Sequence, residues 1–492
     1  MAASLFPIGI YCIPDGALAK QKGGCHLNLS IRNPSLQRIT VFLLVMALIW
    51  SLLGALVVGA AANSHKANGA LAVPLGARLH QFFPGPTPPS DVACRAMGSR
   101  IPCYSPQEMR RAYGLTDLVN DGFTGKGQSI VIIDSFGSPS IADDLQVFDA
   151  GYGLPDPPLF KVLSPLGTVP FDPNNSDMVN WAFETTLDVE WAHAIAPGAN
   201  IVLLTSPVSE TEGVQGMPQF LFLEKYALDH HLGKIISQSW GATENTLFTA
   251  AGREVFEDFN AFYRRAASEH VTVFASCGDS GSANLKQNLT TFYPFPTVIF
   301  PASSPWVTAV GGTSLFATTS GKYQSETVWN EGAADAGGGG ISQVFKEPDY
   351  QQNNLPASDQ ALLGGRRGIP DISYNGDPAT SILVYLSFLH GAVGYFRIGG
   401  TSEGSPQWAG IIAIANQRAD HPLGFLNKAL YELGNSNDAA ESFHDITVGN
   451  NTQPGIPPGI PGYNATRGWD AASGWGTPRA GELIQQLIQL DA

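Results

Sequence analysis

Short apolar runs alternate with amphipathic stretches over most of the chain. Helical patterns cover, for example, residues 177–196 and 253–270. Four apolar runs, each followed by turn-forming residues, have the length of buried strands: residues 129–134, 200–205, 234–239 and 271–276. Continuous apolar strands separated by helices predict an α/β fold, with a parallel sheet covered by helices on both faces. In such folds the functional residues lie at the carboxyl ends of the strands.

One apolar run is much longer than a strand. Residues 41–62 carry no charged side chain, and a helix of this length spans a hydrocarbon core of about 30 Å. Positive charges within residues 1–40 predict that this N-terminal segment is cytoplasmic. The run is either an uncleaved transmembrane signal-anchor or a signal peptide cleaved after the small residues 60–62. Both interpretations predict an extracytoplasmic protein, membrane-anchored or secreted.

A Pro-rich segment follows the long apolar run. Residues 63–103 contain the sequence Phe-Pro-Gly-Pro-Thr-Pro-Pro-Ser at positions 83–90, which predicts an extended linker. Ser105 and Pro106 then form a helix-start signal. We therefore expect the folded domain to occupy residues 104–492.

Composition and charge narrow the possible partners. The formal net charge of -15 argues against nucleic acid, because binding to phosphates requires clustered Lys and Arg. The chain has 492 residues with 44% apolar content, enough for one large core. Of its five cysteines, Cys94 and Cys103 are close enough in sequence to bridge, and the sequence leaves open whether they do.

Residues 399–406, Gly-Gly-Thr-Ser-Glu-Gly-Ser-Pro, join a glycine turn to the start of a small-residue helix. Glycines let the backbone approach a ligand, and Pro406 is tolerated in the first helical turn. The Ser402 hydroxyl would lie at the positive end of this helix, where a developing oxyanion is favoured. Ser402 is therefore a candidate nucleophile, and the alternative is that it only caps the helix.

A serine nucleophile requires a base, and none of the ten histidines lies in the His-Gly-Thr turn that a subtilisin-like enzyme carries. Asp134 resembles the aspartate of such enzymes, but the histidine that would accompany it is missing. Glu184 and Asp188 are four residues apart, so on a helix both carboxyls lie on one face. Apolar neighbours, including Trp181 and Trp191, argue against a solvated acidic face, and a shared proton would relieve the repulsion.

A further carboxyl, Asp279, lies in the sequence Ser-Cys-Gly-Asp-Ser-Gly directly after the strand predicted at 271–276. Aspartate favours turns, so a purely structural role is one interpretation. When protonated, the same group can donate a hydrogen bond to an oxyanion.

Three motifs together, Glu184-x-x-x-Asp188, Ser-Cys-Gly-Asp279-Ser-Gly and Gly-Thr-Ser402-x-x-x-Pro, resemble those of the sedolisin (serine-carboxyl) peptidases. The resemblance extends over roughly residues 104–480. It implies a subtilisin-like fold and hydrolysis of peptides or unfolded proteins at acidic pH. It also implies that Ser402 is the nucleophile and Glu184 the general base. Asp188 would orient Glu184, and Asp279 would be the oxyanion-hole acid.

The same resemblance implies one calcium ion per chain, bound near the C-terminus. Calcium prefers oxygen ligands from carboxylates and backbone carbonyls. Asp445 and Asp470 would supply the carboxylates, and Ile446, Thr466 and Gly468 the carbonyl oxygens. Thr466 stands where glycine is common in the family.

Several alternatives remain open at the level of the sequence. We expect a monomeric endopeptidase that holds its substrate by strand addition along residues 237–241, with tripeptidyl-peptidase action as the alternative. Most members carry a large prodomain, whereas only residues 63–103 separate the apolar run from the expected domain here. A conventional Asp-His-Ser subtilase that uses Asp134 is a second possibility. A third is a catalytically inactive, surface-displayed peptide-binding module on a peptidase fold.

Overall fold

The computed structural model describes residues 78–90, 93–94, 103–332, 335–380, 382–389 and 391–491. The chain divides into two units, Met1–Gly69 and Ala70–Ala492, and the described residues all belong to the second. The predictions for residues 1–40 and 41–62 therefore concern parts of the chain outside the described residues. Within the described ranges, no helix is long and apolar enough to cross a membrane.

An eight-stranded sheet forms the centre of the second unit. Its order is β10-β9-β7-β5-β2-β4-β3, and β15 pairs with β9 off this path. The four predicted strands are all present, and the predicted parallel α/β sheet is confirmed, because only β10 runs antiparallel to its neighbour. The strands of this sheet are β2 (Ser129–Ser135), β3 (Phe160–Leu163), β4 (Asn200–Ser206), β5 (Ile235–Gln238), β7 (Thr272–Ser276), β9 (Thr308–Ala317), β10 (Tyr323–Val328) and β15 (Ile372–Asn375).

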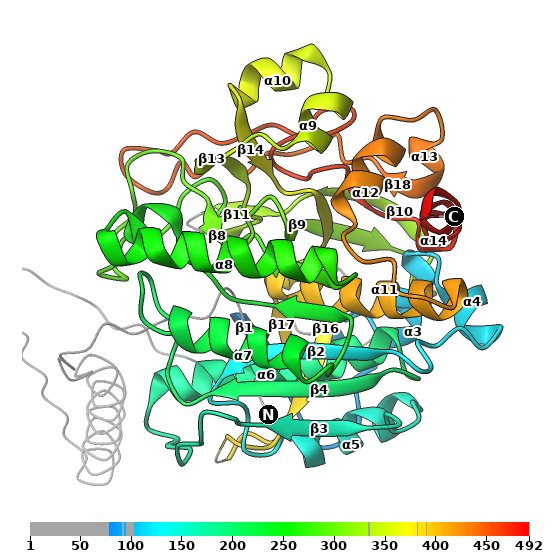
Figure 1. Ribbon diagram of the computed structural model, residues 1–492. Coiled ribbons are helices and arrows are strands. Elements are labelled where there is room, and N and C mark those ends of the chain that lie inside the picture. The colour runs from blue at the N-terminus through cyan, green and yellow to red at the C-terminus, as the bar shows by residue number, and fades with distance from the viewer. Residues whose placement is uncertain are drawn as a thin grey trace, which may run out of the picture. The chain divides into compact units, whose positions relative to one another are not determined.

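Helices cover both faces of this sheet (Figure 1). On one face pack α6 (Ser176–Ile195) and α11 (Gly404–Ala419), and on the other pack α7 (Met217–Asp229) and α8 (Ala250–Ser268). Successive side chains of β2 alternate between the two cores: Ile130 and Ile132 face one, Val131 and Ile133 the other. This double burial explains why residues 130–133 of β2 are all apolar instead of alternating with polar residues.

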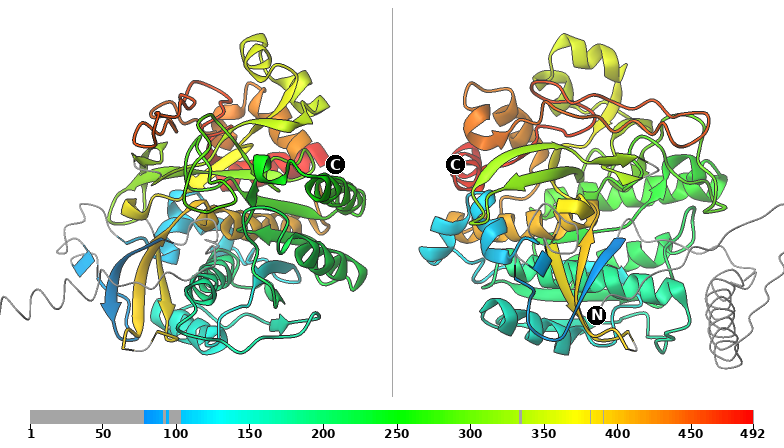
Figure 2. Two further views of the ribbon diagram at one scale, coloured as in Figure 1. Left: turned by 90° about the vertical axis from the view of Figure 1, so that its left-hand side faces the viewer. Right: turned by 180° about the vertical axis from the view of Figure 1, so that it is seen from behind.

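A second, three-stranded sheet has the order β1-β17-β16 (Figure 2). Its strands are β1 (Arg78–Pro84), β16 (Ile382–Leu386) and β17 (Gly394–Gly399). β1 lies within the segment predicted as a linker, yet it pairs antiparallel with β17. Phe83 is only 7% exposed, and the rings of Phe82 and Phe396 lie 4.6 Å apart. Burial of these aromatic side chains attaches part of that segment to the domain, and Pro84 is tolerated because it ends an edge strand.

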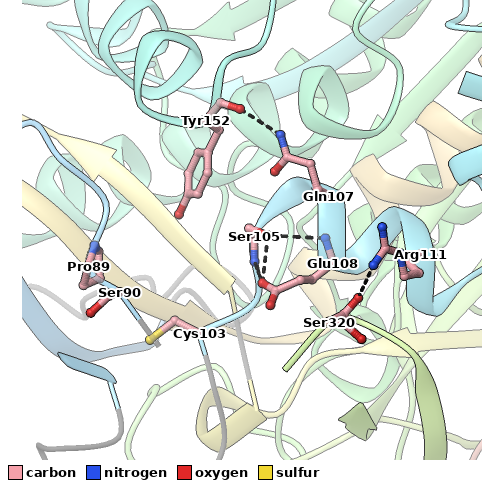
Figure 3. Close-up of a pocket in the computed structure, with 9 residues that line it drawn as sticks. All are labelled: Pro89, Ser90, Cys103, Ser105, Gln107, Glu108, Arg111, Tyr152 and Ser320. Atoms are coloured by element: carbon pink, nitrogen blue, oxygen red, sulfur yellow. Dashed lines mark hydrogen bonds between the residues drawn. The ribbon is translucent and has the colours of Figure 1, made fainter. Parts of the chain in front are cut away.

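The helix predicted to start near residue 105 is α3 (Pro106–Ala112), with Ser105 as its N-cap. Glu108 Oε2 accepts a hydrogen bond from Ser105 N at 2.7 Å, and Ser105 Oγ accepts one from Glu108 N at 3.3 Å (Figure 3). The disulfide Cys94–Cys103, left open by the sequence, is formed. Cys103 and Ser105 also border a pocket of about 310 Å³.

Shorter elements complete the described part of the chain. They are α4 (Thr116–Asn120), α5 (Ile141–Tyr152), β6 (Ala242–Thr243), η1 (Glu244–Leu247), β8 (Ile299–Phe300), β11 (Asn330–Gly332), β12 (Asp335–Ala336), β13 (Gly340–Lys346), α9 (Asp349–Asn354), α10 (Ala357–Leu363), β14 (Arg366–Ile369), η2 (Pro378–Thr380), η3 (Thr401–Glu403), α12 (Asn427–Gly434), α13 (Ala439–Ser442), β18 (Phe443–His444), β19 (Thr477–Pro478) and α14 (Ala480–Asp491).

Candidate active site

Ser402 lies in a tight turn between β17 and α11. The turn passes through Gly400, whose φ of 134° is a conformation that side-chain-bearing residues rarely adopt. Ser402 then falls in η3, and neither η3 nor α11 has a side-chain cap hydrogen bond. The interpretation of Ser402 as a helix cap is therefore wrong. Its side chain is buried, and its hydroxyl lies close enough to Glu184 to lower the pKa of that carboxyl, while neither Glu184 oxygen has a hydrogen-bond partner among the described residues.

Glu184 and Asp188 lie one turn apart on α6, and both are 0% exposed. Burial raises the pKa of Glu184 well above its ordinary value, and the charge of Asp188 raises it further. Burial likewise raises the pKa of Asp188. Asp188 Oδ1 accepts a hydrogen bond at 2.8 Å from Oγ of Ser239, the residue directly after β5. The pair is thus a desolvated one, whose members hold protons more tightly than carboxyls in water.

Asp134 adds another acid to this cluster. It is the second-to-last residue of β2 and is 0% exposed. Burial raises its pKa to about 7, and the neighbouring Thr185 hydroxyl partly offsets this rise. The charge of Asp134 raises the pKa values of both Glu184 and Asp188. Asp134, which resembles the aspartate of subtilisin-like enzymes in sequence, is therefore one member of a group of buried carboxyls.

Asp279 follows β7 and contacts Thr401, the residue before Ser402. Its Oδ1 accepts hydrogen bonds from Thr401 N at 2.7 Å and from Thr401 Oγ1 at 2.8 Å. A further bond from Gly278 N to Thr401 Oγ1 at 3.0 Å joins the two turns. Asp279 is 4% exposed, and its charge also raises the pKa of Glu184. The fold thus brings together four carboxyls and one hydroxyl at the carboxyl ends of the parallel strands.

Within the described residues, the histidine on α6 has another role. His193 is fully buried, and its Nε2 lies 2.8 Å from Pro155 O and 3.3 Å from Asp149 Oδ1. Burial lowers the pKa of His193 to about 4. This histidine therefore links α6 to α5 and the loop after it, and the titratable group beside the Ser402 hydroxyl is a carboxyl, Glu184.

Glu403, the residue after Ser402, was not singled out by the sequence reasoning. Its side chain is 0% exposed, and its Oε1 accepts a hydrogen bond from Asn375 Nδ2 at 3.0 Å. Among the described residues its Oε2 has no hydrogen-bond partner. Burial raises its pKa well above the ordinary value. The sequence did contain a feature that points to Glu403, because it is the only charged residue between Arg397 and Arg418.

The residues considered for calcium converge on one turn of the C-terminal loop. Gly468 N donates to Asp445 Oδ1 and Oδ2 at 3.2 and 3.1 Å, and Thr466 N donates to Asp470 Oδ2 at 2.8 Å. No hydrogen bond between described residues ends on the carbonyl oxygens of Ile446, Thr466 or Gly468. Two carboxylates and three available carbonyls suit a hard cation. No group of three or more His, Cys, Asp or Glu side chains that could hold a metal occurs in the described ranges.

Comparison with known proteins assigns the family. The sequence profile described as "Subtilase family" matches residues 167–451, which include Glu184, Asp188, Asp279 and Ser402. The solved structure titled "Pseudomonas sedolisin (serine-carboxyl proteinase) complexed with two molecules of pseudo-iodotyrostatin" superposes with a TM-score of 0.65 at 28% identity, over 79% of this chain and 99% of that one. This chain belongs to the sedolisin group of the subtilase family.

Sedolisins and their relatives also match at the level of sequence. Kumamolisin of Bacillus sp. (strain MN-32) is 35% identical over 403 residues, covering 80% of this chain and 65% of that protein. Sedolisin of Pseudomonas sp. (strain 101) is 31% identical over 360 residues, covering 72% and 57%. Tripeptidyl-peptidase 1 of Homo sapiens is 29% identical over 327 residues, covering 62% and 52%. The chain thus spans between about half and two thirds of the length of these relatives.

Proposed function

We propose that this sedolisin-type chain is a serine-carboxyl endopeptidase that hydrolyses peptide bonds of peptides or unfolded proteins at acidic pH. The observation that carries the proposal is the burial of the Ser402 hydroxyl beside Glu184, whose pKa it lowers, inside a buried group of carboxyls. A carboxyl thus occupies the place that a histidine takes in the commoner triad. Membership of a peptidase family supports peptide as the substrate.

In the first step Ser402 Oγ attacks the carbonyl carbon of the scissile bond, and its proton passes to Glu184. Asp188, one helical turn away and held by Ser239, would share a proton with Glu184 and orient it during the reaction. When the tetrahedral intermediate collapses, Glu184 returns the proton to the leaving amine. Water then attacks the acyl carbon while Glu184 takes its proton, and Glu184 returns that proton to Ser402 Oγ as the Oγ–carbon bond breaks and the acid product leaves. A substrate strand paired with residues 237–241 would present its carbonyl to Ser402.

Asp279 supplies the hydrogen bond to the oxyanion. Its Oδ1 already accepts two hydrogen bonds from Thr401, so a proton on this carboxyl belongs on Oδ2. A neutral acid donates to the oxyanion, whereas an ionised one repels it. Activity therefore requires a protonated Asp279 together with a singly protonated Glu184–Asp188 pair, and both conditions favour acidic pH.

We also propose one calcium ion in the C-terminal loop. Asp445 and Asp470 would hold it through carboxylates, and Ile446, Thr466 and Gly468 through carbonyl oxygens. When bound, the ion would link the segment after β18 to the turn at 466–468 and stabilise the loop. The oxygen donors around that turn support this proposal.

Residues 41–62 lead us to propose that the peptidase is exported, as a membrane-anchored or secreted protein. Separation of membrane and soluble fractions, followed by mass spectrometry of the N-terminus, distinguishes an uncleaved anchor from a signal peptide removed after residues 60–62. Recovery of the full-length chain in the cytoplasm would contradict both forms of the proposal.

An N-terminally blocked peptide tests the type of cleavage. An endopeptidase cleaves such a substrate within the chain, whereas a tripeptidyl-peptidase requires a free N-terminus. We expect internal cleavage of the blocked peptide by the full chain and none by Ser402→Ala. Release of tripeptides only from the unblocked peptide would replace the endopeptidase assignment, and binding without cleavage would favour the peptide-binding module.

A further inference from the structure

A cavity of about 870 Å³ lies at the edge of the sheet opposite the candidate active site. Trp306, in its wall, comes just before β9 begins, and Phe425 follows the end of α11. Asp134 and Asp279 instead lie at the carboxyl ends of β2 and β7. The cavity is thus separate from the catalytic carboxyls, and its volume is in the range of small-molecule sites.

Three aromatic rings form a continuous wall of this cavity. The ring centroids of Trp306 and Phe425 are 5.5 Å apart, and those of Tyr350 and Phe425 are 5.9 Å apart. Tyr350 OH donates to Pro305 O at 2.9 Å and accepts from Asn427 Nδ2 at 3.1 Å. The wall therefore presents aromatic surface that is fixed in place before any ligand binds.

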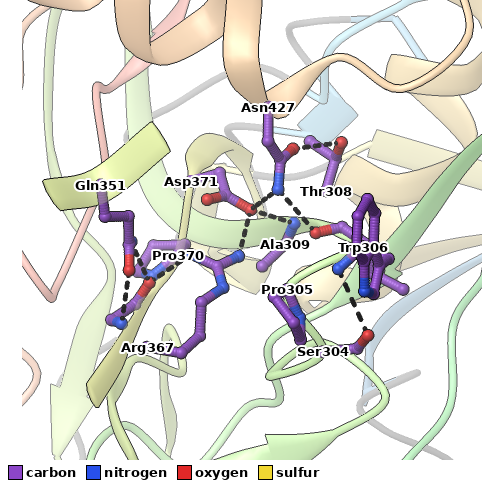
Figure 4. A network of polar contacts seen from close by, with 12 residues as sticks. Ser304, Pro305, Trp306, Thr308, Ala309, Gln351, Arg367, Pro370, Asp371 and Asn427 are labelled. Atoms are coloured by element: carbon purple, nitrogen blue, oxygen red, sulfur yellow. Dashed lines mark hydrogen bonds and ion pairs between the residues drawn. The ribbon is translucent and has the colours of Figure 1, made fainter. Parts of the chain in front are cut away.

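A buried polar network (Figure 4) adjoins this wall through Asn427, which donates to both Tyr350 and Asp371. Asp371 Oδ2 accepts hydrogen bonds from Arg367 Nη2 at 2.6 Å, Ala309 N at 2.8 Å and Asn427 Nδ2 at 3.2 Å. Arg367 and Asp371 are both fully buried and form an ion pair. Because its charge is matched by Asp371, Arg367 does not serve as counter-ion to another acid in this region.

Two polar side chains that line the cavity each hold a buried oxygen without a hydrogen-bond partner among the described residues. Glu347 is 7% exposed and lines the cavity, and its Oε1 has no hydrogen-bond partner among the described residues. Asn260, from α8, also lines it, and its Oδ1 lacks a partner within the same ranges. Burial raises the pKa of Glu347. An almost fully buried carboxyl with an unused acceptor oxygen favours a ligand that brings N–H donors and positive charge.

The other charged groups of the cavity lie at its exposed rim. Lys346 and Lys428 line it together with Asp349 and Glu432, and all four are exposed. Two positive and two negative charges in contact with water largely cancel. No ion pair joins Glu347 to a lysine or arginine in the described part of the chain. Glu347 therefore dominates the electrostatics of the inner part.

We propose that this cavity binds a small primary amine with an aromatic or alkyl body. The ammonium group would donate to Glu347 and Asn260, and the body would lie against Trp306, Tyr350 and Phe425. Aromatic faces attract cations and bury apolar carbon, and a carboxyl at the inner end gives the site its preference for charge.

Calorimetric titration of the full-length Ser402→Ala chain, with 2-phenylethylamine and its neutral analogue 2-phenylethanol, tests this site. The amine is expected to bind at least tenfold more tightly than the alcohol. Glu347→Gln should weaken the amine about tenfold and leave the alcohol within twofold, whereas Trp306→Ala should weaken both. Glu432→Gln, which changes an exposed rim carboxylate, is the matched control and should leave both affinities within twofold.

The outcomes separate this site from other acidic sites. Amine binding that survives Glu347→Gln, as it would if the amine bound to Glu184 and Asp188, would overturn the proposal. So would equal affinities for amine and alcohol, or no binding of either at millimolar concentration. Melting curves show whether each variant is folded. If Glu347→Gln does not fold, two other results decide instead. They are the preference of Ser402→Ala for the amine over the alcohol, and a tenfold loss of that preference when Asn260→Ala is added.

Discussion

Burial sets the chemistry of each carboxyl group around Ser402. In water a glutamate has a pKa of about 4.3 and is a weak base at any higher pH. Inside the protein, desolvation raises the pKa of Glu184, and the charges of Asp188, Asp134 and Asp279 raise it further, while the Ser402 hydroxyl partly offsets this. A carboxyl in this environment holds a proton firmly enough to act as the base of a serine nucleophile.

Asp279→Asn tests the oxyanion assignment. An amide donates a hydrogen bond at any pH, whereas the carboxyl donates only when protonated. We expect the variant to retain part of its activity and to shift the alkaline limb of its pH–rate profile upward. A profile with an unchanged alkaline limb would show that another group controls it.

Glu403→Gln and Glu403→Ala form a matched pair next to the nucleophile. Glutamine keeps the acceptor for Asn375 Nδ2 and the volume of a protonated glutamate. We expect Glu403→Gln to retain activity within about threefold at acidic pH, and Glu403→Ala to lose tenfold or more because the turn at Ser402 loses its support. Equal activities of the two variants would assign no positioning role to Glu403.

At the scale of elements, the parallel strands and their helices were predictable because local patterns encode them. The sheet β1-β17-β16 was not, since β1 resembles a Pro-rich spacer and its partner β17 follows some 300 residues later. The motif residues Glu184, Asp188, Asp279 and Ser402 were identifiable from their spacing and resemblance. Ser239 was expected only within the substrate-holding segment 237–241 and Glu403 was given no role, because only the folded chain shows that they contact Asp188 and Asn375.

Phe83→Ala tests whether β1 is part of the folded domain. Phe83 is 7% exposed, and truncating a buried phenylalanine typically costs about 3–5 kcal/mol of unfolding free energy. We expect a loss in this range by chemical denaturation, compared with less than about 0.5 kcal/mol for Val393→Ala, which removes methyl groups from a side chain that is 42% exposed. A change below about 1 kcal/mol for Phe83→Ala would mean that β1 contributes little.

Chelation tests the calcium proposal at the C-terminal loop. Removing the ion should leave Asp445 and Asp470 without their shared cation and lower the melting temperature. Re-addition of calcium, but not of magnesium, should restore it, since calcium accepts irregular oxygen sites more readily. Asp470→Asn should melt at the same temperature with and without chelator. An unchanged melting curve of the parent protein in chelator would remove these residues from a metal site.

At the scale of the whole molecule, the protein buries many acids with few cations beside them. Burial raises the pKa of Asp149 to about 8, those of Glu212 and Glu326 to about 7, and those of Glu190 and Glu224 well above their ordinary values. Above pH about 4.3 the unfolded chain has lost these protons, while the folded chain still binds them. The folded state thus binds more protons, so its stability falls as pH rises toward the folded pKa values.

Melting temperature as a function of pH checks this consequence. With full-length Ser402→Ala, to avoid self-digestion, we expect a maximum at acidic pH and a steady decrease between about pH 5 and 8. Glu224→Gln, which removes one buried acid, should make the decrease of melting temperature with rising pH measurably shallower. A melting temperature that is constant or rises over this interval would show that the buried acids are ionised in the folded protein.

The pH–rate profile of the full chain on a denatured protein tests the central claim most directly, measured beside Ser402→Ala and Glu184→Gln. We predict activity that peaks at acidic pH, vanishes in Ser402→Ala and falls by at least a thousandfold in Glu184→Gln. Activity that peaks near neutral pH and survives Glu184→Gln would contradict a carboxyl base. No turnover at any pH by the folded, calcium-loaded chain would contradict catalysis itself.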